Sequence, residues 1–130
     1  MRYKIQTTKP QQFIDITAKV AEEVKKSNVQ DGLAVIFVPH TTAGVTINEN
    51  ADPNVVRDMI SSLEKTFPVD GEYFHFEGNA HAHIKASLMG SSSTVIIQEG
   101  KLLLGTWQGI YFCEFDGPRN REFYVKILRG

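Results

Sequence analysis

The clearest strand pattern in the sequence is Arg121-Glu122-Phe123-Tyr124-Val125-Lys126-Ile127-Leu128. Phe123, Val125 and Ile127 alternate with more polar residues, and a period of two is typical of a strand that buries one face. Further β-prone runs precede it, separated by turns that contain glycine, at residues 94–98, 101–104 and 106–115. We therefore predict a C-terminal β-meander.

Helices and strands alternate in the first two thirds of the chain. Three helices are predicted: residues 17–28, a helix from Asp52-Pro53 to about Thr66, and one capped by Asn79 that ends near Gly90. Strands are predicted at residues 2–7, 13–16, 33–38 and 44–48. Residues 33–38 are apolar throughout, which predicts a central strand covered on both faces. The whole pattern predicts one α+β domain over residues 1–130, with a mainly antiparallel sheet and about three helices.

Composition and charge narrow the class of protein. Hydrophobic residues make up 42% and charged residues 22% of the 130 residues, as in ordinary globular proteins. The net charge of −1, without a basic run, argues against a nucleic-acid partner, and no apolar stretch approaches the length that a membrane span needs. The single Cys113 excludes an internal disulfide and suits a reducing compartment, so we expect a cytoplasmic protein.

The four histidines are the first candidates for chemistry. They are His40, His75, His81 and His83, and neutral imidazole is a preferred ligand of zinc and related divalent ions. On a helix, His81 and His83 would point about 200° apart and could not share one ion. We therefore expect His40, His75 and His83 to hold a divalent metal such as zinc. The alternative is that they are ordinary surface histidines.

Other polar side chains gather at the predicted strand ends. Glu49 ends a strand, and no helix or turn explains it. Thr41 and Thr42 lie at a bend that suits either an anion or an ordinary turn. Strand periodicity places Gln108 and Glu114 on a mostly apolar face, where a polar group is costly unless it is paired or lines a pocket.

These polar residues belong to a set of short motifs. The motifs are Pro39-His40-Thr41-Thr42-Ala43, Ile47-Asn48-Glu49, Glu77-Gly78-Asn79-Ala80-His81-Ala82-His83-Ile84-Lys85-Ala86, Gly90-Ser91-Ser92, Gly100-Lys101-Leu102, Leu104-Gly105-Thr106-Trp107-Gln108 and Glu114-Phe115-Asp116-Gly117-Pro118-Arg119. In this order, and over most of the chain, the sequence resembles the YjbQ family, an uncharacterised protein family that is described as secondary thiamine-phosphate synthases.

The resemblance implies a compact α+β fold assembled as a homotrimer, with sites near the subunit boundaries. It also implies that His40 and His83, joined by His75, form a metal-binding cluster. The implied activity is a weak thiamine-phosphate synthase reaction, in which a pyrimidine-methyl diphosphate condenses with a thiazole phosphate and pyrophosphate is released.

Two functions are expected as alternatives. In the first, the protein is a metal-binding transferase with Glu49 as the acid or base and His40 as the second catalytic residue. Its phosphorylated substrate would be bound by Thr41, Thr42, Lys101, Thr106, Gln108 and Arg119. In the second, the same residues form a non-catalytic trimeric module that binds a metal or a small phosphorylated ligand. A third interpretation assigns the polar residues to subunit contacts and helix caps.

Overall fold

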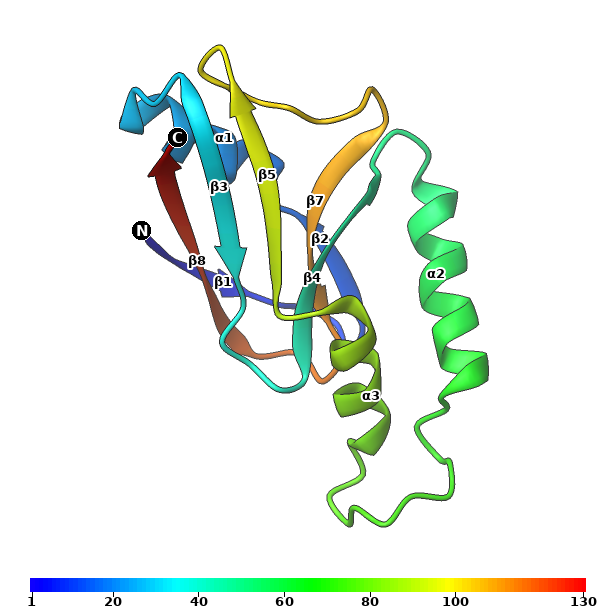
Figure 1. Cartoon of the computed structure of the whole chain (residues 1–130). Coiled ribbons are helices and arrows are strands. Elements are labelled where there is room, and N and C mark those ends of the chain that lie inside the picture. The colour runs from blue at the N-terminus through cyan, green and yellow to red at the C-terminus, as the bar shows by residue number, and fades with distance from the viewer.

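The computed structural model describes residues 1–130 and contains eight strands and three helices (Figure 1). In chain order these are β1 (Arg2–Gln6), β2 (Gln12–Asp15), α1 (Thr17–Ser27), β3 (Asp31–Phe37), β4 (Ala43–Glu49), α2 (Pro53–Thr66), α3 (Ala80–Met89), β5 (Ser92–Gln98), β6 (Lys101–Leu102), β7 (Gln108–Glu114) and β8 (Asn120–Arg129). The α+β class and the three helices confirm the prediction from sequence. None of the helices combines the length and the apolar character that crossing a bilayer requires.

The strands form two antiparallel sheets. The larger sheet has the order β1-β8-β3-β5-β6, and the smaller one has the order β2-β7-β4. The predicted C-terminal meander is therefore wrong as a continuous unit, because β7 belongs to the smaller sheet whereas β5, β6 and β8 belong to the larger. The segment at residues 103–107 carries the chain from one sheet to the other, so β6 and β7 do not pair.

The main hydrophobic core fills the space between the two sheets. Ile36 of β3 and Phe123 of β8 enter it from the larger sheet, and Phe112 of β7 enters it from the smaller one. The helix α1 adds Val20 and Val24, which are its buried residues. Period-two alternation along each strand thus supplies one buried face to the core.

A smaller core lies on the other face of β7. Tyr111, Cys113 and Phe115 pack there with Ala82 and Ala86 of α3. The helix α2 covers the same side with side chains that are only partly buried, so the order of layers is large sheet, small sheet, then α2 and α3 (Figure 1). Cys113 is fully buried in this core, and burial raises the pKa of its thiol, as is typical of a structural cysteine.

The strand β3 is covered on one face only, which corrects the prediction of a doubly covered strand. Ala34 and Ile36 are buried, but Leu33 and Phe37 remain 38% and 45% exposed. The exposed side continues onto the neighbouring strands and forms an apolar outer sheet face, made of Leu33, Phe37, Ile96, Tyr124 and Leu128. The apolar run at residues 33–38 predicted that both faces of β3 are covered, but no other part of the chain covers the outer face.

Candidate functional site

A polar cavity of about 380 Å³ opens at the end of the molecule that carries the connection between α2 and α3. Three segments line it: residues 39–42 between β3 and β4, Glu77, Asn79 and His83 around the start of α3, and Asp116, Arg119 and Arg121 around the start of β8. No lining side chain is hydrophobic apart from Pro39. Such a lining suits a charged or strongly polar ligand.

A buried ion pair forms the base of this cavity. Glu114 is fully buried and accepts hydrogen bonds from Arg121 Nε (2.8 Å), Arg121 Nη2, Thr7 Oγ1 (2.8 Å) and the Asp116 amide (3.0 Å). Burial alone would raise the pKa of Glu114, but the bonds from Arg121, Asp116 and Thr7 outweigh it and lower the pKa. The carboxylate is therefore held in its charged form as a structural group.

The two threonines of the Pro39-His40-Thr41-Thr42 motif differ in burial and in hydrogen bonding. The Thr42 hydroxyl is buried and accepts a hydrogen bond from Arg121 Nη2 at 2.8 Å. Thr41 is exposed at the cavity. Of the two predicted substrate contacts, only Thr41 has a hydroxyl free of the Arg121 network.

Arg119 is anchored at the rim of the cavity. Its Nε donates to the Asp116 carbonyl oxygen at 2.7 Å, and its Nη2 donates to Asp116 Oδ2 at 2.9 Å. Asn79 Nδ2 donates to the same carboxylate oxygen at 2.9 Å, whereas Asn79 Oδ1 is buried without a partner. Three of the five N–H groups of Arg119 remain available to a ligand.

Only some of the four histidine side chains lie close together. His75 and His83 meet edge to face, with ring centroids 5.2 Å apart, and His83 shares the cavity with His40. His40 Nε2 accepts the Glu122 amide at 3.0 Å, so the neutral ring carries its proton on Nδ1. Burial, followed by the charge of Arg121, lowers the pKa of His40. No three His, Cys, Asp or Glu side chains converge on a common point where they could hold one ion.

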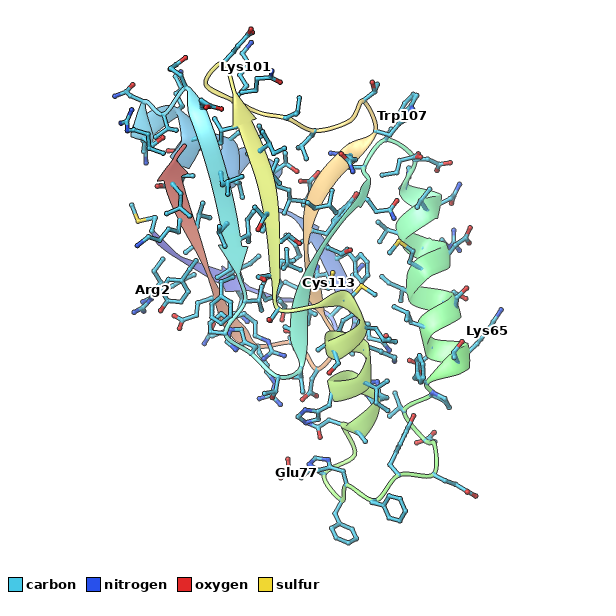
Figure 2. The ribbon with its side chains drawn as sticks, viewed as in Figure 1. Arg2, Lys65, Glu77, Lys101, Trp107 and Cys113 are labelled. Carbon is cyan, nitrogen blue, oxygen red and sulfur yellow. The ribbon has the colours of Figure 1, made fainter.

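The remaining predicted site residues lie at the opposite end of the molecule, where Figure 2 labels Lys101 and Trp107, far from Glu77. Glu49 is the last residue of β4, which extends about 20 Å from the cavity end. It pairs with Gln108 in the ladder, and its Oε2 accepts the Asp52 amide at 3.2 Å. Within one chain, Glu49, Lys101, Thr106 and Gln108 therefore cannot act with His40.

Sequence reasoning missed a second buried polar group, built around Lys85. Lys85 is fully buried on α3 and contacts His81, Glu64 and Gln11. Burial would raise the pKa of Glu64, but the bonds from Lys85, Gln11 and the Val69 amide lower it to about 2. The spacing of His81 and Lys85, four residues apart on one helix face, was the signal that could have revealed the pair.

These features define a class of protein: a small two-sheet α+β domain with an ion-paired polar cavity at one end. The chain belongs to the UPF0047 protein YjbQ-like family, whose family model matches residues 1–130.

Relatives with known names and structures agree with this membership. The chain is 58% identical over 127 residues to UPF0047 protein MJ1081 of Methanocaldococcus jannaschii, covering 98% of this chain and 92% of that protein. It is 51% identical over 126 residues to UPF0047 protein YugU of Bacillus subtilis, covering 96% of each. A YjbQ/UPF0047 crystal structure from Clostridium acetobutylicum has 62% identity and a TM-score of 0.97, covering 98% of this chain and 99% of that one. A YbjQ-like protein of unknown function from Sulfolobus solfataricus has 33% identity and a TM-score of 0.96, covering 100% and 96%.

Replacing Arg121 with methionine would leave the Glu114 carboxylate buried without its cation. Loss of one partner of a buried ion pair costs about 3–5 kcal/mol, so we expect Arg121→Met to lower the free energy of unfolding in urea by this amount. The control Arg2→Met removes an exposed pair with Glu122 and should cost less than about 1 kcal/mol. Equal losses in the two variants would contradict the role given to Arg121.

Proposed function

We propose that the polar cavity binds a small phosphorylated molecule and that the protein acts on this molecule as a transferase. The observation that carries the proposal is the Arg119 side chain, which Asp116 holds in place while three N–H groups stay free. A fixed guanidinium is well suited to phosphate oxygens, because it can donate two parallel hydrogen bonds. Thr41 and the Nδ1–H of His40 add further donors to the lining.

A second depression supports a ligand that also carries a flat ring. It has a volume of about 370 Å³, shares His83 with the polar cavity, and is lined by Tyr73, Phe74 and Ile84 among others. Aromatic and aliphatic walls favour stacking and burial of an apolar ring. A heteroaromatic phosphate would therefore find a suitable surface on each side of His83.

This ligand class agrees with the thiamine-phosphate synthase reaction that the family resemblance implies. In that reaction the bond between the pyrimidine methylene carbon and its diphosphate oxygen breaks, and pyrophosphate leaves with the bonding electrons. The thiazole nitrogen supplies the electron pair of the new bond to the same carbon. Arg119 would stabilise the negative charge that develops on the leaving pyrophosphate. On the sequence grounds of a single reduced thiol, we expect this reaction to take place in the cytoplasm.

Binding of inorganic pyrophosphate, measured by calorimetry, tests the cavity directly. Because hydrogen bonds to charged groups contribute about 1.5–3 kcal/mol, we expect Arg119→Ala to weaken binding about tenfold or more. Arg57→Ala on the exposed side of α2 removes the same charge and should leave binding unchanged. Absence of binding to the unaltered protein, or equal binding by both variants, would refute the proposal.

Turnover separates the enzyme from the non-catalytic module. Incubation with the pyrimidine diphosphate and the thiazole phosphate should release pyrophosphate and form thiamine phosphate, detectable by mass spectrometry. Binding of both substrates without product would favour the binding module.

Binding of a divalent metal such as zinc by His40, His75 and His83 stays a prediction. His75 and His83 are neighbours, and Glu77 and Asp116 bring carboxylates to the polar cavity that His83 also lines. A cation there would offset the charge of a phosphorylated ligand beside these carboxylates. A role for His40 would require its ring to give up the Glu122 amide.

Elemental analysis of protein purified without an affinity tag tests the metal. A three-histidine site predicts metal in the unaltered protein and its loss from His40→Ala, His75→Ala and His83→Ala, with circular dichroism to verify folding. If His40→Ala is the only variant that retains its metal, the site consists of two histidines, His75 and His83. Full metal content in folded His83→Ala would disprove the assignment.

The homotrimer also stays a prediction, supported by two apolar surfaces that the chain leaves uncovered. Phe74 and Phe76, between α2 and α3, are fully exposed, and the outer sheet face is more than one third exposed at each residue. Apolar exposure on this scale favours contact with another chain, and contacts between two different surfaces of identical chains can close into a ring.

Light scattering coupled to size exclusion tests the assembly. We expect three times the 14.6 kDa mass of the chain for the unaltered protein and a smaller mass for Phe74→Ser/Phe76→Ser. Leu88→Ser, on an exposed position of α3, is the control and should leave the mass unchanged. A trimer that survives the double change would remove the two phenylalanines from the interface.

A further inference from the structure

The buried ammonium of Lys85 is saturated by three partners. Its Nζ donates to Glu64 Oε2 at 2.8 Å, to Gln11 Oε1 at 3.2 Å and to His81 Nδ1 at 2.8 Å. Three donors thus meet three acceptors, and the lysine has no exposed surface. A buried charge that is fully bonded in this way is costly to disturb, so it fixes the relative positions of its partners.

Two of these partners, Glu64 and His81, flank one loop, the connecting loop of residues 67–79. Glu64 lies in the last turn of α2, before the loop begins, and His81 and Lys85 lie in α3, after it ends. Glu64 also reaches into the loop itself, since its Oε1 accepts the Val69 amide at 3.2 Å. The ion pair between Lys85 and Glu64 therefore holds the two ends of the connecting loop together. We call this ion pair the clasp.

Besides this ion pair, the bond from Asn79 Nδ2 to Asp116 Oδ2 ties the C-terminal end of the connecting loop to the sheets, and the loop supplies side chains to the candidate site. Most of its residues are exposed. It nevertheless contributes Glu77 and Asn79 to the polar cavity, and it carries His75 to the ring of His83. The arrangement of these groups depends on where the loop is held.

We propose that Lys85 is a positioning residue of the candidate site, which acts through Glu64 to hold the connecting loop in the arrangement that binds the ligand. Lys85 itself does not reach the ligand, because it is fully buried. The inference rests on the proposed function for the ligand, a phosphorylated molecule, and on the contacts of Glu64 for the clasp.

Glu64→Gln is the sharpest change available. One carboxylate oxygen accepts the Val69 amide, and the other accepts Lys85 Nζ and Gln11 Nε2 at 2.8 and 2.6 Å. A glutamine of the same shape has only one acceptor oxygen, so its NH₂ group must face one of these two sets of donors. The substitution opens the clasp while keeping the volume of the side chain.

The experiment combines loop motion with ligand affinity in the full-length protein. Order parameters from ¹⁵N relaxation should fall from about 0.85 toward 0.6 for residues 69–79 of Glu64→Gln and stay unchanged in β7. If the loop then holds the binding arrangement a tenth of the time, the apparent Kd for inorganic pyrophosphate rises about tenfold. Glu22→Gln removes the same charge from an exposed pair with Lys26 on α1 and should change neither quantity.

Several outcomes overturn the proposal: a connecting loop as rigid as in the unaltered protein, a uniform loss of order across the fold, or a loosened loop with unchanged affinity. Lys85→Met, which removes the other half of the clasp, should reproduce the effects of Glu64→Gln if it folds. If the unaltered protein binds no pyrophosphate, the proposed function fails, and so does the site that Lys85 would position. The order parameters then decide whether the clasp itself exists.

Discussion

The ion pair between Glu114 and Arg121 is the contact on which the end of the molecule with the polar cavity depends. Glu114 ends β7 in the smaller sheet, and Arg121 is the second residue of β8 in the larger one, so the pair joins the two sheets. Removing two such charges from water costs several kcal/mol per ion. The hydroxyl of Thr7 and the amide of Asp116 complete the bonding of the carboxylate and help to offset this cost. The sheets are thus fixed to each other at the base of the cavity.

A consequence is that structural and exposed polar groups stand side by side in the sequence. Thr42 turns inward to Arg121, while its neighbour Thr41 faces the cavity. Arg121 pairs with buried Glu114, while Arg119, two residues earlier, lies at the rim with free donors. In each pair, one residue belongs to the buried network around Glu114, and the other is exposed at the cavity. Motif membership alone therefore does not indicate which role a residue has.

Much of the fold could be predicted because its signals are local. Asp52 accepts the Asn54 amide and Pro53 opens α2, as the Asp-Pro pair predicted. The alternation of β8 is reproduced, with Phe123 and Val125 buried. The division of the C-terminal strands between two sheets could not be predicted, since no local pattern tells which strands pair.

The site was harder to predict for the same reason. The prediction from sequence grouped Glu49 with His40 because they are nine residues apart, but an extended strand separates residues that are close in sequence. Conversely, Glu64 and Lys85 lie 21 residues apart and form an ion pair at 2.8 Å. The prediction was right about the polar character of the strand ends. It did not anticipate which ends the fold brings together.

The covering of β7 on both faces has a consequence for the chemistry of the chain. Cys113, the only thiol, lies on the side that α2 and α3 cover and has no exposed surface. A thiol reagent cannot react there while the helices remain in place, and α2 has no fully buried residue to retain it. Cys113 is therefore labelled in native buffer only while the helical layer is lifted from the sheet. When the layer closes faster than the reagent reacts, the ratio of this labelling rate to that of an exposed thiol gives the free energy of the opening without any introduced probe.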